Sequence, residues 1–585
     1  MPDLPSTQHA IQFTGPNEVV HNTAKPVFRP GPYQLVLKVE AVGICFSDTK
    51  LLHAFTAHPR KSEVLSGVGR DVLAEIPSYT PGELPLVPGH ECAGRIVAVG
   101  SEVHRHRVGE RVLVQADYRH LPTAQANAAF GYNFEGGLQE YVLLDERMII
   151  DPDTGERFLI PVGDDPSRSA VGLLEPWACV ECSYASEERN GLAPGGRLLV
   201  VAEPGRTLSG LDELIAATPP GHVTGSLADE AQTAALAATV ARAVIEVRLL
   251  ESLDEASGQR FDDIVYFGAD AARIETLQDL LGPRGTVDVV LDGATVDRPV
   301  AIDVGRIHYD LLRWVGTSGD SAATGYASVP ATGELRVGDR MAVVGAAGPM
   351  GFMHVIRALS MGIPGIAVDA IDIDDARLAH LAEIAGPLAE QAGLTARFVS
   401  SRTEPVTENA YDYVAVMMPA PPLVLQAIAM AAPAARVNLF AGFPVGTRAV
   451  IDLTDVLARG LYLFGTSGSE IRDMQAVLTR LEAGQLDTNL SLDAVCGMEG
   501  VADALAAVEA RSSGGKIVVY PQLHDLGMVR LGELPDRFPK VAAKLHDGRW
   551  TREAEEELLA EAGDGGKGHD AAGASDASGP SRAAG

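Results

Sequence analysis

The sequence predicts an α/β fold, in which a mostly β N-terminal domain precedes two doubly wound, Rossmann-like units in tandem. Three observations predict it. Short alternating runs rich in Val and Gly, separated by turn residues, fill residues 1–185. From about residue 193 to 520 the pattern becomes alternating strand and helix, which is typical of a parallel α/β sheet. Within that stretch, short motifs recur about 149 positions apart.

The β domain is predicted from four apolar runs bounded by turn residues, at 33–42, 94–100, 111–115 and 138–144.

The tandem units are predicted from an internal repeat. Four pairs of segments correspond: 195–201 with 338–344, 261–265 with 411–415, 302–303 with 451–452, and 315–319 with 464–468. The last two pairs share one offset, which favours a true repeat over chance similarity between strand motifs.

The second unit carries a dinucleotide motif at 343–351, Val-Val-Gly-Ala-Ala-Gly-Pro-Met-Gly, between a predicted strand and a helix at 354–359. Its glycines let the backbone approach a pyrophosphate at the helix N-terminus. Asp372 follows Gly351 by 21 positions, ends a strand at 365–372, and can accept from a ribose hydroxyl, which favours NAD over NADP. The expected cofactor contacts are Gly345, Ala346, Gly348, Pro349, Met350, Gly351, Asp372 and Arg377.

The first unit lacks this loop. Glu203 stands where a pyrophosphate would need neutral amides, so this unit is predicted not to bind a dinucleotide in that way. Its run 303–310 clusters polar side chains, in which His308 and Tyr309 either reach a substrate or belong to an interface or a buried hydrogen-bonding cluster.

Composition narrows the function classes. A chain of 585 residues indicates three or four domains, and a net charge of −31 argues against nucleic acid and anionic membranes as partners. Five cysteines predict no disulfide framework and a reducing compartment. The most apolar window, 427–446, is broken by Pro433, Arg436 and Pro444. We therefore expect a soluble, cytoplasmic protein.

Three motifs carry a candidate metal site. Cys45 lies in Gly-Ile-Cys-Phe-Ser-Asp, His90 and Glu91 lie in Val-Pro-Gly-His-Glu, and Glu175 lies in Leu-Leu-Glu-Pro. A thiolate, an imidazole and a carboxylate are the ligands of a catalytic zinc that keeps one position open. Each residue alone is usually a packing or surface residue, but their joint occurrence ahead of a dinucleotide loop predicts metal binding.

On these motifs the chain resembles the medium-chain zinc-dependent alcohol and polyol dehydrogenases. Within this family, the Glu-Pro pair at 175–176 makes the chain most similar to the sorbitol dehydrogenase-like and L-sorbose-1-phosphate reductase-like branch. The resemblance implies a GroES-like catalytic zinc domain at 1–190 and an NAD-binding Rossmann domain at 336–520. Residues 193–335 are then an extra, degenerate Rossmann-like unit, followed after the NAD domain by a helical appendage at 521–562 and a disordered tail at 563–585.

The resemblance also implies roles. Cys45 and His90 would be zinc ligands, Glu91 and Glu175 would compete for the third position, and Ser47 would pass the substrate proton outward. The implied reaction is hydride transfer between NAD(H) and a secondary alcohol or ketone, on a polyol, sugar or sugar phosphate, in a dimer or tetramer. A zinc-free reductase of the same superfamily and a non-catalytic dinucleotide-binding scaffold are the alternatives.

Three departures from the family pattern stand out. No cysteine lies between residues 110 and 141, so we expect one catalytic zinc and no structural zinc. The segment 53–84 is an insertion expected to form a flap or contact loop, and 193–335 is additional. Cys179 and Cys182 fall on one helix face, where core packing is favoured over redox chemistry.

Overall fold

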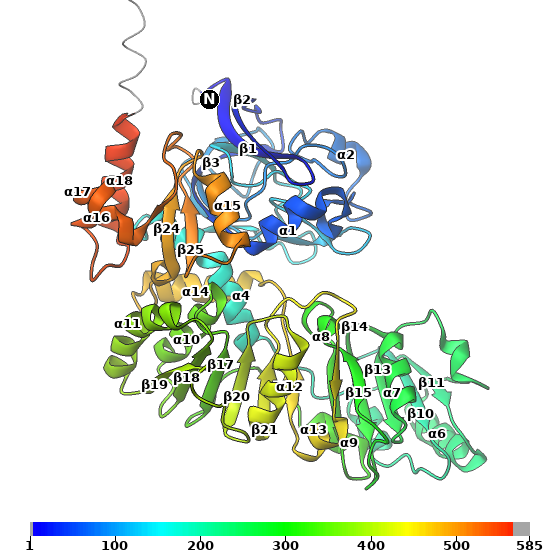
Figure 1. The fold of residues 1–585 in the computed structure, drawn as a ribbon. Helices are drawn as coiled ribbons and strands as arrows, with labels where there is room; N and C mark the ends of the chain where they lie inside the picture. Colours follow the sequence, from blue (N-terminus) through cyan, green and yellow to red (C-terminus); the bar gives the residue numbers. More distant parts are fainter. Residues whose placement is uncertain (1–3, 566–585) are drawn as a thin grey trace, which may run out of the picture. The chain divides into compact units, whose positions relative to one another are not determined.

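The computed structural model describes residues 4–565, and the predicted disordered tail lies almost entirely outside them. The chain divides into two compact units, Met1–Ala178 with Glu470–Gly585, and Cys179–Ser469 (Figure 1).

The first unit is built on an eight-stranded sheet in the order β26-β24-β25-β3-β4-β5-β9, with β8 also paired to β3. Its strands are β3 (Gln34–Ile44), β4 (Glu91–Val99), β5 (Arg111–Val114), β8 (Tyr141–Asp145), β9 (Leu159–Pro161), β24 (Leu492–Cys496), β25 (Lys516–Val519) and β26 (Val529–Arg530). Two hairpins join β1 (Thr7–Gly15) to β2 (Glu18–Pro26) and β6 (Asp117–Pro122) to β7 (Asn127–Ala129).

The helices of this unit are mostly short. They are α1 (Phe46–Ala54), α2 (Arg70–Ala74), α3 (Arg168–Gly172), α14 (Ile471–Glu482), α15 (Val501–Glu509), α16 (Leu534–Arg537), α17 (Pro539–Ala542) and α18 (Arg552–Gly565), together with the start of α4 (Leu174–Ala185). The insertion 53–84 contains two short 3₁₀ turns and α2.

The second Rossmann-like domain ends before the expected residue 520. Strand β25 pairs with β24 on one side and antiparallel with β3 on the other, so residues 470–520 belong to the first unit. Strand-helix alternation continues through this segment, and the alternation alone does not show which sheet a strand joins.

The second unit holds one twelve-stranded sheet in the order β12-β11-β10-β13-β14-β16-β23-β21-β20-β17-β18-β19 (Figure 1). Its first half uses β10 (Arg197–Ala202), β11 (His222–Ser226), β12 (Val247–Leu249), β13 (Phe261–Phe267), β14 (Leu281–Val290) and β16 (Arg313–Thr317). Its second half uses β17 (Arg340–Val344), β18 (Ala367–Asp372), β19 (Thr395–Ser400), β20 (Tyr411–Val416), β21 (Ala431–Asn438) and β23 (Tyr462–Phe464).

Numbered within each half, both halves have the strand order 3-2-1-4-5-6, which is the order of dinucleotide-binding sheets. Pairing is parallel within each half, and the halves meet where β16 pairs antiparallel with β23. A separate two-stranded pairing joins β15 (Val300–Asp303) to β22 (Arg448–Ile451).

Helices cover the strands of the second unit. They are α5 (Leu211–Ala217), α6 (Glu230–Ala243), α7 (Ala271–Leu277), α8 (Val304–Tyr309), α9 (Ala322–Ala327), α10 (Pro349–Ser360), α11 (Asp375–Ala392), α12 (Pro421–Met430) and α13 (Leu453–Ala458). In the described part of the chain, no helix combines the length and apolarity needed to cross a membrane.

Candidate active site

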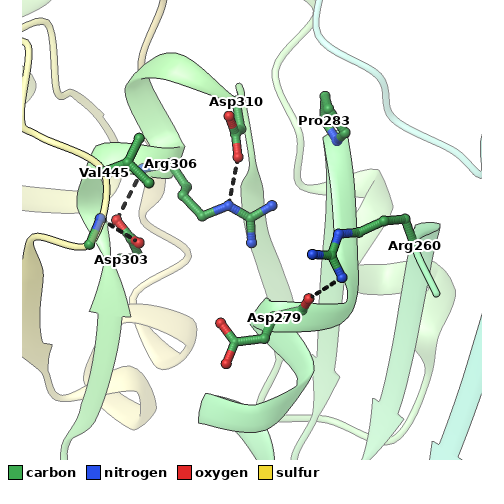
Figure 2. A pocket seen from close by; sticks show the side chains of 8 residues that line it. Arg260, Asp279, Pro283, Asp303, Arg306, Asp310 and Val445 are labelled. Atoms are coloured by element: carbon green, nitrogen blue, oxygen red, sulfur yellow. Dashed lines mark hydrogen bonds and ion pairs between the residues drawn. The ribbon is translucent and has the colours of Figure 1, made fainter. Parts of the chain in front are cut away.

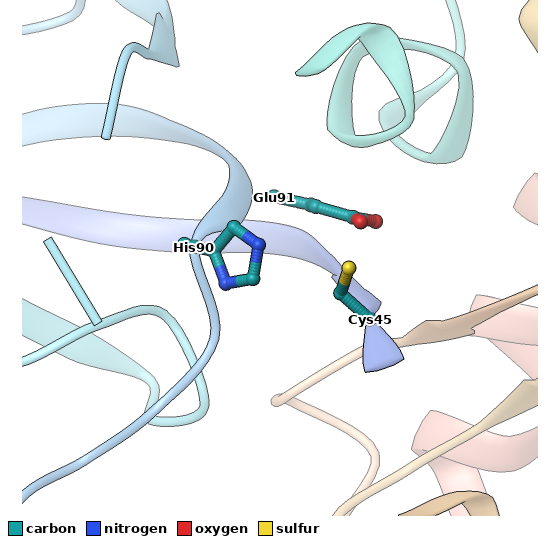
Figure 3. Close-up of side chains that lie close together, drawn as sticks. All are labelled: Cys45, His90 and Glu91. Atoms are coloured by element: carbon teal, nitrogen blue, oxygen red, sulfur yellow. The ribbon is translucent and has the colours of Figure 1, made fainter. Parts of the chain in front are cut away.

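Side chains from two neighbouring strands form a candidate metal centre in the first unit. Cys45 follows β3 as the N-cap of α1, while His90 and Glu91 stand where β4 begins. One ligand atom from each of Cys45, His90 and Glu91 lies within 4.8 Å of the other two (Figure 3). The antiparallel pairing of Gly43 with Glu91 brings the two motifs together, although 45 positions separate Cys45 from His90.

His90 is oriented by a buried carboxylate. Its Nδ1 lies 3.2 Å from Oδ1 of Asp48, which is fully buried. That contact leaves Nε2 facing the cluster, as in carboxylate–histidine–metal arrangements. Burial favours neutral His90, but Tyr132 and Asp48 act in the opposite sense, and the net effect raises the pKa of the imidazole well above its usual range.

Glu91 is fully buried, and its two carboxylate oxygens have different surroundings. Its Oε1 accepts from Lys516 Nζ at 2.5 Å, whereas Oε2 has no hydrogen-bond partner among the described residues. Burial opposes the charge of Lys516, but Glu91, Cys45 and Glu175 outweigh burial and raise the pKa of the lysine. A Cβ on Gly43 would lie 2.0 Å from Oε2, so only glycine leaves room for this carboxylate.

These residues fit a zinc ion. The donors are a thiolate, an imidazole and a carboxylate, which is a three-ligand set that leaves a fourth position open. The buried Oε2 of Glu91 lacks a partner among residues 4–565, and a metal ion would supply one. Outside this cluster, the described residues contain no other group of three His, Cys, Asp or Glu side chains with ligand atoms this close.

Glu175 lies in the first turn of α4, near the cluster but outside it. Its charge contributes to the raised pKa of Lys516, so the two side chains interact electrostatically. Of the two candidates for the third ligand, Glu91 therefore has its carboxylate in the cluster. Glu175 lies outside the cluster and affects the pKa of Lys516, which bonds to Glu91.

Ser47 lies beside the candidate ligands. Its Oγ is 3.2 Å from His90 Nε2, and its hydroxyl is also a hydrogen-bond partner of Tyr132. The ring of Tyr132 lies 5.2 Å from that of His58. Burial, with Arg60 next, lowers the pKa of His58 to about 4, so this imidazole is neutral near pH 7. A short series of polar side chains thus leads away from the cluster.

The glycine loop of the second unit connects β17 to α10. Gly345 has φ +86°, a left-handed conformation that glycine adopts without strain. Gly348 is the N-cap of α10, with Pro349 at its first position. A Cβ on Gly351 would lie 2.3 Å from the carbonyl oxygen of Gly345, so the helix packs directly against the loop. Ala346 lies in the same turn, and Met350 follows Pro349 in the first turn of α10.

Asp372 ends β18 and is tied to this loop. Its carboxylate accepts from the backbone amides of Ala347 at 2.8 Å, Ile373 at 2.8 Å and Asp374 at 3.0 Å. A carboxylate offers about four acceptor positions, so the three bonds leave capacity for one more donor. Arg377, in the first turn of α11, donates through Nε to Asp374 Oδ2 at 3.0 Å.

The corresponding turn of the first half is filled by its own side chain. Glu203 accepts from the backbone amides of Ala269 and Asp270 and from the hydroxyl of Tyr266. A Cβ on Gly268 would lie 2.5 Å from the Glu203 carboxyl carbon. The carboxylate thus accepts hydrogen bonds from the amides that follow β13. That this half does not bind a dinucleotide stays a prediction from the sequence.

The polar run 303–310 lies at the joint between the two halves. It forms α8, capped by Asp303, which also accepts from the amide of Gly446 at 2.9 Å. His308 is buried with Nδ1 3.3 Å from the carbonyl oxygen of Leu439. The sequence left two interpretations of this run open, contact with a substrate or a place in an interface or buried hydrogen-bonding cluster. The burial of His308 at this joint favours the interface.

A hollow of about 510 Å³ lies beside this run (Figure 2). Its two guanidinium groups are already engaged, because Arg260 donates to the carbonyl of Asp279 and Arg306 donates to Asp310 and to the carbonyls of Gln278 and Leu281. Both cations of the hollow therefore already donate to oxygen atoms of the chain.

Two residues that contact the candidate ligands, Asp48 and Lys516, were not predicted from the sequence. Asp48 lies within the Cys45 motif, three residues after the cysteine, and that spacing on a helix start was the available signal. Lys516 is 425 positions from Glu91, and no local pattern connects them.

Comparison with known proteins supports the resemblance. Residues 31–153 match the family described as alcohol dehydrogenase GroES-like domain. Similar proteins include D-altritol 5-dehydrogenase of Agrobacterium fabrum (28% identical; 34% of this chain, 52% of that protein) and sorbitol dehydrogenase of Bacillus subtilis (28%; 33% and 50%). L-sorbose 1-phosphate reductase of Klebsiella pneumoniae is 31% identical over 27% of this chain and 38% of that protein. The chain thus spans about half the length of these relatives, or less.

Among solved structures, 2R,3R-butanediol dehydrogenase from Bacillus subtilis superposes with a TM-score of 0.50 at 15% identity, covering 88% of this chain and 100% of that one. At this identity the likeness concerns the fold alone. The GroES-like match and the polyol dehydrogenase relatives support the resemblance of this chain to the medium-chain alcohol and polyol dehydrogenase superfamily.

Proposed function

We propose that the protein is a zinc-dependent oxidoreductase that transfers a hydride between NAD(H) and a secondary alcohol or ketone. The observation that carries the proposal is the Cys45–His90–Glu91 cluster, in which Glu91 Oε2 is buried without a partner among the described residues. The relatives include an altritol dehydrogenase, a sorbitol dehydrogenase and a sorbose phosphate reductase, which favours a polyol, sugar or sugar phosphate as substrate.

A zinc ion bound here would act as a Lewis acid toward a substrate oxygen. The protein's own residues prepare the site for that role. Asp48 holds the imidazole of His90 in one orientation, and Lys516 holds one oxygen of Glu91 while leaving the other for the metal. Ser47 would accept the proton that leaves a substrate hydroxyl and pass it toward Tyr132, since its hydroxyl neighbours both His90 and Tyr132.

We further propose that the second half of unit two binds the dinucleotide. The backbone at Gly345, Gly348 and Gly351 would face the pyrophosphate, and the remaining acceptor position of Asp372 would take a ribose hydroxyl, which favours NAD over NADP. Arg377 would lie near the adenosine end. NAD against NADP kinetics test this assignment, and a clear preference for NADP would contradict it.

Metal analysis tests the zinc proposal. We expect about one zinc per chain, and Cys45→Ala should lose both the metal and turnover in a screen of polyols and polyol phosphates with NAD. Cys496→Ala, at a buried cysteine of β24, is the matched control and should keep both. Active protein without stoichiometric metal would instead identify a zinc-free reductase, and cofactor binding without turnover on any substrate would identify a scaffold.

The third ligand is tested by comparing Glu91→Gln with Glu175→Gln. We propose Glu91, because its carboxylate lies in the cluster. A larger loss of zinc affinity in Glu175→Gln would reassign the position.

A further inference from the structure

The joint between the two halves of unit two obeys a two-fold relation. In the antiparallel pairing of β16 with β23, Trp314 lies opposite Leu463. These two residues are 149 positions apart (463 minus 314), which is the offset of the sequence repeat. Each is therefore the repeat equivalent of the other, and the two-fold axis passes between them.

The pairing of β15 with β22 has the same property. Ala301 lies opposite Val450, which is again its own equivalent at the offset of 149. On either side, Val300 pairs with Ile451 and Ile302 pairs with Ala449. At the offset of 149, Val300 corresponds to Ala449 and Ile302 corresponds to Ile451. Exchange of the two halves therefore converts the first pair into the second. An interface in which residue i meets j and j meets i is the isologous kind that joins identical subunits.

Packing around the strands repeats the relation. A Cβ on Gly316 would lie 3.0 Å from Leu457, and a Cβ on Gly465 would lie 3.2 Å from the Cα of His308. Gly465 is the equivalent of Gly316, and Leu457 is the equivalent of His308, at the same offset.

The flanking helices α8 and α13 also correspond. Each begins after an aspartate, Asp303 or Asp452, whose side chain accepts from the amide three residues later. The same local capping device is thus kept on both sides of the axis.

The joint is apolar and closed. One continuous cluster of buried side chains contains Ile302, Ile307 and Trp314 from the first half with Ile451 and Leu463 from the second. Side chains on both faces of the joint are thus removed from water together, as in an obligate interface.

The first half takes part in this joint but has no glycine loop after β10, where Glu203 stands in the corresponding turn. We propose that residues 193–335 are a permanently attached partner of the NAD-binding half. Their strand β16 pairs with the edge of β23, and their strand β15 pairs with β22, so the isologous interface lies within one chain. This edge is therefore not available to a second copy of the protein, and one chain offers one dinucleotide site for two Rossmann-like halves.

Cysteine pairs in the full-length protein test the proposal. Val450 is 57% exposed and Ala301 is partly buried, so both tolerate substitution without opening the core. In Ala301→Cys/Val450→Cys, mild oxidation or a short bismaleimide should form a crosslink within one chain, detected by peptide mass spectrometry at the monomer mass of 61.5 kDa.

Val450→Cys alone is the decisive variant. Because Val450 lies on the axis, a two-fold dimer of second halves would place it opposite the same residue of another copy. We expect no more covalent dimer than in the parent protein. A covalent dimer in either variant, or no crosslink in the double variant with both reagents, would overturn the proposal.

Discussion

Replacing Gly351 by alanine should weaken cofactor binding without disturbing the metal centre. The new Cβ would lie 2.3 Å from the carbonyl oxygen of Gly345 and 2.7 Å from the Cα of Ala346. Both atoms belong to the backbone of the loop, so neither can rotate away, and α10 must separate from the turn. Overpacking of this kind costs about 1–3 kcal/mol.

If that cost falls on the bound conformation of the loop, the NADH dissociation constant should increase by a factor between about 5 and about 140, since 1.4 kcal/mol is tenfold in affinity. Fluorescence or calorimetric titration with NADH measures it, with zinc content recorded in the same preparations.

Gly282→Ala is the matched control, because its Cβ would meet no atom nearer than 3.6 Å and it lies in the half that lacks the loop. We expect its NADH affinity to be that of the parent. If Gly351→Ala also binds NADH with the parent's affinity, the loop does not hold the cofactor as described.

Three further predictions concern the first unit. Lys516→Met leaves the buried Glu91 carboxylate without its cation, so chelator-treated protein should lose about 3–5 kcal/mol of unfolding free energy in a urea titration; an unchanged midpoint would contradict the ion pair. Asp48→Asn should weaken zinc about 10- to 100-fold in competition with a chromophoric chelator, because it no longer orients His90 as a carboxylate does; parent-like affinity would remove Asp48 from the site. His58, whose pKa burial lowers from 6.5 to about 4, is protonated in the unfolded chain but not in the folded one between these values. Stability should therefore fall as the pH is lowered from 6.5 to 4, and His58→Gln should flatten that part of the curve; an identical slope in the variant would refute this cause.

The candidate site was accessible from the sequence where its residues lie in short local motifs. Cys45 and His90 each stand in a glycine-containing turn whose residue types point to metal chemistry, and the 4.8 Å cluster brings them together. Lys516 could not be found in this way, since it reaches Glu91 only because β25 pairs with β3, which in turn pairs with β4.

The choice between Glu91 and Glu175 was also beyond the sequence. Both are carboxylates in suitable motifs, and their separation depends on where the start of α4 lies relative to β4. The structure puts Glu91 in the cluster, and it leaves Glu175 interacting with Lys516.

By itself, the sequence determined the resemblance to the dehydrogenases, the metal-ligand motifs, the glycine loop with Asp372, and the 149-residue repeat, because each depends on residue types at fixed spacing. Only the tertiary structure decided which sheet residues 470–520 join, which cation accompanies Glu91, and how the two repeats meet. These features depend on strand pairing between segments far apart in the chain, and periodicity within a segment carries no information about its partner.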